Sequence, residues 1–259
     1  DTDRIRQALG ISPQDTFARY ALYLLGEDGP PAFVRHRAQD VIDAALDFMK
    51  AGLMHEAIRV LDTCAVEDPM ICYYRTYCTG LPAKHASLSL CFPNRLEDIA
   101  VLNASSADWQ AQYLLGCLYY DRENYAAAEK AWEASKAGNE TFAFTHRNLA
   151  QLRYDHKRDA PGARQALEEA LRLQPENARI VYELLQLYKN MNDSVKARLA
   201  FLSLHQEQVA QRDDCYLEQI ILLTQDEQYE KAASLLLKKR FTIYEGGEGK
   251  LTRHHTWLW

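Results

Sequence analysis

The chain has 259 residues, of which 47% are hydrophobic and 25% are charged, so it can bury a substantial apolar core. Its formal net charge of −6 and its lack of a long Lys/Arg run argue against a nucleic-acid-binding surface, which needs clustered positive charge. No uninterrupted apolar run is long enough to cross a membrane.

The N-terminus indicates whether the chain has been processed, and the cysteines indicate its cellular compartment. The sequence begins at Asp1 rather than Met and lacks the apolar core of a signal peptide, so we expect a processed product or a piece of a longer protein. The six cysteines form no C-x-x-C pair, and most lie among apolar residues of predicted helices. We expect reduced core cysteines in a cytoplasmic protein.

The N-terminal segment contains a helix-start signal. In the run Ser12-Pro13-Gln14-Asp15, a hydroxyl side chain precedes a proline. Serine is a favoured N-cap and proline a favoured first helical residue, since its fixed φ fits the helix and its missing N–H would have no partner there. We therefore expect a helix that starts with Ser12 as its N-cap.

A helix–turn–helix pattern then recurs along the chain. Its clearest unit starts at Trp109, with small residues such as Gly116 where the two helices would cross and large ones such as Trp132 between them. A step of 34 residues from Gly116 reaches Ala150, again preceded by leucine. The units that fit are 37–69, 109–141, 143–176, 178–207 and 213–240, with a degenerate pair at 70–107 that contains an unusually long loop at 80–93.

This spacing predicts an all-α fold of tetratricopeptide-like helix pairs. A single pair cannot bury its apolar face, so neighbouring pairs must stack and share a core. We expect residues 1–240 to form a right-handed superhelical solenoid, and residues 241–259 to be a glycine-rich segment that leaves the array.

Motifs for catalysis, metals and cofactors are weak. His254-His255 lacks the spacing of a helical metal pair. The glycine-rich run 245–250 is not a phosphate-binding loop, because Tyr244 stands where the first glycine is needed and Leu251 replaces the required Ser or Thr. On composition alone, the run indicates a tight turn after the last helix. We expect no catalytic residue, bound metal or cofactor in this chain.

Five segments follow one another in an order that generic repeats would not reproduce. They are CFPNRLEDIAVL (91–102), YLLGCLYYDRENYAAAEKAW (113–132), RNLAQL (147–152), RDDCYLE (212–218) and RFTIYEGGEGK (240–250). The series resembles a mainly bacterial family of unknown function, in which an N-terminal β-sandwich similar to galactose mutarotases and some glycosidases precedes a C-terminal tetratricopeptide array. The resemblance covers most of residues 13–257, although Tyr244 replaces a common tryptophan and the β-sandwich is absent.

The resemblance implies that the chain is the C-terminal array of such a protein. The glycine-rich run would then line a sugar site or a domain interface, and the sequence leaves both open. The domain-interface or ligand candidates that it implies are Arg212, Asp213, Glu218, Tyr244, Glu245, Glu248 and Lys250.

The repeat register also predicts a binding face. In such arrays the first helix of each pair lines the concave surface, where aromatic residues and arginines supply contact area and directed hydrogen bonds. Several of the tyrosines could instead pack between repeats. The candidates are Tyr113, Tyr120, Arg147, Tyr154, Arg179, Tyr182 and Lys189.

Two functions fit these patterns. The first is a non-catalytic interaction module that binds a peptide, or another domain of its parent protein, through the concave face. The alternative is an accessory part of a carbohydrate-active enzyme that helps to complete a sugar site on the missing β-sandwich, and this rests on the resemblance. The expected partners are therefore a protein or peptide, the missing domain of the same polypeptide, or a carbohydrate, and neither nucleic acid nor a membrane.

Overall fold

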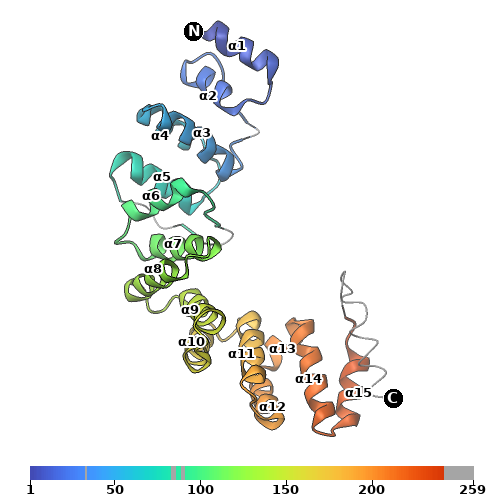
Figure 1. The fold of residues 1–259 in the computed structure, drawn as a ribbon. Coiled ribbons are helices and arrows are strands. Elements are labelled where there is room, and N and C mark those ends of the chain that lie inside the picture. Colours follow the sequence, from blue (N-terminus) through green and yellow to red (C-terminus); the bar gives the residue numbers. More distant parts are fainter. Residues whose placement is uncertain (33, 83–85, 89–90, 242–259) are drawn as a thin grey trace. The chain divides into compact units, whose positions relative to one another are not determined.

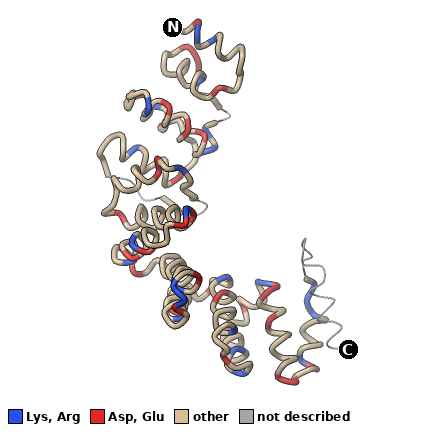
Figure 2. The backbone as a smooth tube through the Cα atoms, viewed as in Figure 1, with Lys and Arg blue, Asp and Glu red and all other residues tan. Residues whose placement is uncertain are grey.

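The computed structural model describes residues 1–32, 34–82, 86–88 and 91–241, and these residues form fifteen α-helices and no strand (Figure 1). This confirms the predicted all-α class. No helix among them is long and apolar enough to cross a membrane. The chain divides into two compact units, Asp1–Gly138 and Asn139–Trp259. Acidic and basic residues are interspersed along the helices of each unit (Figure 2).

The first unit contains eight helices among its described residues. The contacts within the pairs α3–α4 and α7–α8 are the most extensive, and α5 and α6 are joined more loosely across their long connection. One hydrophobic core runs through the unit from Tyr20 to Ala131. The helices are α1 (Thr2–Ile11), α2 (Thr16–Leu24), α3 (Ala38–Lys50), α4 (Met54–Leu61), α5 (Pro69–Thr79), α6 (Leu96–Ala104), α7 (Trp109–Asp121) and α8 (Tyr125–Gly138).

The prediction that Ser12 caps a helix start is wrong. Ser12 is the C-cap of α1, and α2 starts at Thr16 with Asp15 as its N-cap. The Asp15 carboxylate accepts a hydrogen bond from the backbone N–H of Ala18 at 2.8 Å. A carboxylate at this position gains both that bond and the favourable end of the helix dipole, which explains why Asp15 sets the boundary.

Two adjacent tyrosines of α5 form hydrogen bonds to aspartates at the N-terminal ends of α6 and α7. The hydroxyl of Tyr74 donates to Asp98 at 2.7 Å, and the hydroxyl of Tyr73 donates to Asp108 at 2.9 Å. Asp98 is buried near the start of α6, and Asp108 is the N-cap of α7. Burial, and then the neighbouring carboxylates, raise the pKa of both tyrosines, so both remain hydrogen-bond donors. This arrangement orders the degenerate pair despite its long loop.

The second unit has seven described helices, and the pairs α9–α10 and α14–α15 make the most extensive contacts. A short helix that the repeat pattern did not predict, α13, lies between α12 and α14 and contacts α11 and α14. Its presence coincides with looser contacts between α11 and α12. The helices are α9 (Ala143–Asp155), α10 (Ala160–Leu173), α11 (Ala178–Asn190), α12 (Val195–Leu204), α13 (Gln206–Gln211), α14 (Asp213–Gln225) and α15 (Tyr229–Lys238).

The close crossing of α7 and α8 depends on a glycine. A Cβ atom added at Gly116 would overlap the ring of Trp132, which is 2% exposed. The indole N–H of Trp132 donates to the backbone carbonyl of Tyr113 at 3.2 Å, so the ring cannot move aside without losing this bond. We therefore expect Gly116→Ala to destabilise the protein by about 1–3 kcal/mol, despite the better helix propensity of alanine.

Urea unfolding followed by circular dichroism checks this expectation. Gly10→Ala is the matched control, because Gly10 lies in α1 and an added Cβ would meet nothing within 4 Å beyond its chain neighbours and its own helix backbone. The control should be neutral or stabilising by up to about 1 kcal/mol. Equal stability of Gly116→Ala and the wild type would contradict the proposed crossing.

The six cysteines all lie in the described part of the chain and none is in a disulfide, but only Cys91 and Cys215 are buried. Burial raises the pKa of each of these two thiols to about 12. At pH 8 they are therefore protonated as well as shielded, and the thiolate is the reactive form. We expect iodoacetamide to modify them more slowly than the half-buried Cys64 and Cys78, as measured by peptide mass spectrometry. Equal rates in the native protein would show that these positions are not core sites.

Candidate functional site

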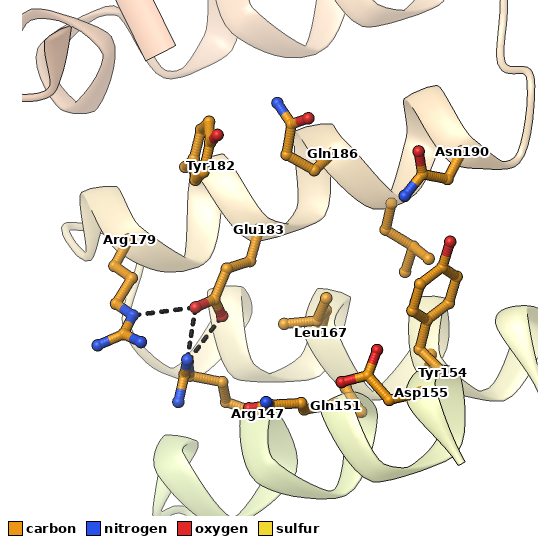
Figure 3. Close-up of a pocket in the computed structure, with 13 residues that line it drawn as sticks. Arg147, Gln151, Tyr154, Asp155, Leu167, Arg179, Tyr182, Glu183, Gln186 and Asn190 are labelled. Atoms are coloured by element: carbon orange, nitrogen blue, oxygen red, sulfur yellow. Dashed lines mark hydrogen bonds and ion pairs between the residues drawn. The ribbon is translucent and has the colours of Figure 1, made fainter. Parts of the chain in front are cut away.

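A hollow of about 320 Å³ lies in the second unit, among α9, α10 and α11 (Figure 3). We call it the α9–α11 groove. Its volume is at the lower end of the range of small-molecule pockets and suits one or two inserted side chains. It is lined by Arg147, Ala150, Gln151, Tyr154, Asp155, Ala163, Leu167, Arg179, Tyr182, Glu183, Gln186, Leu187 and Asn190.

The floor of the α9–α11 groove is apolar, and it belongs to the core of the unit. Ala150 and Ala163 are 1% exposed, and Leu167 and Leu187 also line the groove and belong to the same buried cluster. Both alanines lie where α9 and α10 pack together, and their short side chains fill little of the space that the groove occupies. The repeat packing itself thus creates the hollow.

The rim carries side-chain amides that are free to bind a ligand. The side-chain amides of Gln151, Gln186 and Asn190 have no hydrogen-bond partner among the described residues. Each amide offers one acceptor and two donors, the same groups that a peptide backbone presents. In Figure 3 they project from α9 and α11 on either side of the apolar floor.

One end of the groove holds two arginines on a shared carboxylate. Arg147 donates from Nε to Glu183 at 2.6 Å and also through a terminal nitrogen, which makes a bidentate pair. Arg179 donates from Nε to the same carboxylate at 3.0 Å. The side chain of Arg147 is 14% exposed, whereas that of Arg179 is 64% exposed, and its terminal nitrogens have no partner among the described residues. Glu183 therefore orients both cations, and Arg179 keeps donors for a ligand.

The structure brings together four of the seven residues predicted for the binding face, namely Arg147, Tyr154, Arg179 and Tyr182. Lys189 does not line the groove and instead pairs with Glu218 at 2.9 Å. Tyr113 and Tyr120 belong to the first unit. The ring of Tyr120 packs against those of Tyr125 and Trp132, the packing role that the sequence left open.

The candidates drawn from the family resemblance are engaged in packing where they are described. Arg212 pairs with Asp214 and lies over the ring of Tyr182, with its guanidinium carbon 5.3 Å from the ring centroid. The hydrogen bond to Asp214 raises the pKa of Arg212. Asp213 pairs with Lys239 at 3.0 Å. These contacts join α11, α14 and the end of α15, so the sugar-site role of these residues stays a prediction.

Glu218 is 6% exposed and lies between Lys189 and Arg198, which is itself 8% exposed. This cluster ties α11, α12 and α14 together. Candidates Tyr244, Glu245, Glu248 and Lys250 lie outside the described residues.

Glu183, Asp155 and Asn190 line the groove but were missed by the sequence analysis. A signal for Glu183 was present, because it stands four residues after Arg179 on one helix, the spacing at which side chains meet. Its pairing with Arg147 joins two repeats and depends on how they stack. In the part of the chain that the structure describes, no group of three His, Cys, Asp or Glu side chains could hold a metal ion.

No family model matches the chain. Among solved structures, it is similar to PilF of Pseudomonas aeruginosa, at 14% identity over 78% of this chain and 89% of that one, with a TM-score of 0.49. It is also similar to YrrB, described as a TPR protein with an unusual peptide-binding site, at 15% identity over 94% and 96%, with a TM-score of 0.43. Yeast Tom70 matches at 16% identity over 92% of this chain and 46% of that one, with a TM-score of 0.45. Similarities this distant carry no argument about what this chain binds.

The buried position of Glu218 gives a direct test of its structural role. Glu218→Gln keeps the shape but leaves Arg198 buried without its counter-charge, so we expect a loss of about 3–5 kcal/mol in the free energy of unfolding. Glu169→Gln is the control, since Glu169 pairs with the 68%-exposed Arg172 and should change stability by less than about 1 kcal/mol. Urea unfolding at neutral pH measures both. Equal stability of the two variants would mean that Glu218 is not a structural ion-pair partner.

Proposed function

We propose that the chain is a non-catalytic interaction module that binds a peptide segment of a partner protein in the α9–α11 groove. One observation carries the proposal: three unpartnered amides flank an apolar floor beside two arginines that a carboxylate holds in place. Such a surface offers a peptide what it needs, an apolar site for one side chain and hydrogen-bonding groups for its backbone.

The polar residues of the groove favour binding over catalysis. Arg147 and Glu183 neutralise each other, and a bidentate arginine–carboxylate pair is a poor proton donor or acceptor. The amides of Gln151 and Gln186 do not titrate, and they can only donate and accept hydrogen bonds. Tyr154 and Tyr182 supply rigid contact area with few rotatable bonds, a common feature of binding hot spots.

The carbohydrate alternative gains no support from the described contacts. Arg212, Asp213 and Glu218 are all used within the second unit, in ion pairs that join its helices. The glycine-rich run lies outside the described residues. The peptide-binding groove is therefore the better-supported function.

Selection from a displayed library of random decapeptides tests the proposal. The immobilised full chain should enrich peptides whose affinity falls about tenfold in Gln151→Ala/Gln186→Ala, because this double variant removes two of the three rim amides and leaves the helices intact. A loss of one to two hydrogen bonds at about 0.5–1.5 kcal/mol each accounts for a change of this size. Calorimetric titration of the selected peptides measures the affinity.

The matched control is Gln165→Ala/Gln225→Ala, which replaces two exposed glutamines on α10 and α14 that do not line the groove. It should bind the selected peptides as the wild type does. Equal affinity of all three proteins would place the binding site elsewhere. A library that yields no peptide specific for this chain would count against peptide binding altogether.

A further inference from the structure

The α9–α11 groove is electrically polar along its length. Arg147 and Arg179 lie near the starts of α9 and α11, whereas Asp155 and Asn190 are the last residues of these helices. Figure 3 shows that both helices run in the same direction, with the two arginines at one end of the groove and Tyr154, Asp155 and Asn190 at the other. The groove thus has a cationic end and an acidic end, with the apolar floor between them.

The helix dipoles do not account for the positions of these charges. A helix start carries a partial positive charge and a helix end a partial negative one, so a cation at the start and an anion at the end are each disfavoured by about 0.3–1 kcal/mol. Arg179 is the second residue of α11, and Asp155 is the last residue of α9. Both therefore oppose the dipole of their own helix.

The acidic end lacks an internal counter-charge. Glu183 offsets part of the positive charge at the other end, but Asp155 is exposed and has no ion-pair partner among the described residues. The basic residues Lys157 and Arg158 follow α9 and do not line the groove. The charged side chain that lines the groove at this end is therefore the carboxylate of Asp155.

The distance between the two ends sets the length of the ligand. From Arg179 to Asn190, α11 rises by about 16 Å at roughly 1.5 Å per residue. Along α9, from Arg147 to Asp155, the rise is about 12 Å. An extended peptide advances by roughly 3.3–3.6 Å per residue, so four or five residues span the groove.

We propose that the α9–α11 groove selects a peptide segment of about five residues with an apolar side chain at its centre, an acidic residue at one end and a basic residue at the other. The acidic residue meets the free terminal nitrogens of Arg179, and the basic one meets Asp155. The central side chain rests between Leu167 and Leu187. This inference rests on the proposed function, since it specifies what the same groove binds.

Five capped peptides test the charge pattern by calorimetric titration against the full chain. Two carry mixed ends, Glu-Ser-Leu-Ser-Lys and Lys-Ser-Leu-Ser-Glu, because the groove charges do not fix the direction of the bound backbone. The others carry two glutamates, two lysines or two glutamines at the ends. We expect the better mixed peptide to bind about threefold to tenfold more tightly than either like-charged peptide at low salt, as two partly exposed ion pairs allow. The preference should fade near 1 M salt, where charges are screened within about 3 Å.

Charge reversal gives the sharper result. Arg179→Glu should shift the preference to the peptide with two lysines, and Asp155→Lys should shift it to the peptide with two glutamates. Arg172→Glu is the matched control, since Arg172 is 68% exposed and pairs with a nearby glutamate but does not line the groove. It should retain the preference of the wild type.

The outcomes separate this inference from the proposed function. If all five peptides bind equally and binding is lost in Gln151→Ala/Gln186→Ala, the charge pattern is overturned and the groove remains a peptide site. If the charge reversals leave the preference unchanged, the inference is likewise overturned. If neither these peptides nor library-selected ones depend on the rim glutamines, the proposed function fails and the inference with it.

Discussion

The structure depends on one constraint, namely that its helices are too short to be stable in isolation. Its described helices have 6 to 14 residues, and isolated helices of this length are marginal in water. Each must bury its apolar side against neighbours, and the cores of both units are built from such shared faces. Close approach then requires small residues at the crossings, as at Gly116 beside Trp132.

The α9–α11 groove is a consequence of the same packing. Ala150 and Ala163 let α9 and α10 approach closely, and the first helices of two successive pairs then face a common space. Because these helices run in the same direction, their starts coincide at one end and their last residues at the other. A polar ligand site with a defined axis therefore arises from the repeat without any special loop.

The sequence predicted the features that depend on repeat spacing, and it missed the contacts that depend on how the repeats stack. The repeat period predicted the helix pairs, and the register placed Arg147 and Arg179 on the same side of their helices, where the structure brings them together. It could not show that Glu183 joins the two arginines, because that contact crosses from one repeat to the next. It also missed α13, since a single extra turn has no period to detect.

Local chemistry was ambiguous where two residues compete for one role. At the start of α2, both Ser12 and Asp15 are good N-caps, and only the chain path shows that Asp15 takes the role. Lys189 occupies a register position on the predicted binding face, yet the buried Glu218 draws it into an ion pair. A register fixes which side of a helix a residue occupies, but its neighbours decide whether the side chain remains available to a ligand.

Photo-crosslinking is the most direct test of the central claim that peptides bind in the α9–α11 groove. A library-selected peptide, with a diazirine analogue of leucine in place of its apolar residue, would be irradiated with the full chain, and the adducts mapped by mass spectrometry. The account predicts adducts on α9, α10 and α11 at groove-lining residues such as Leu167 and Leu187. Adducts confined to α1–α8, or to α12–α15, would contradict it.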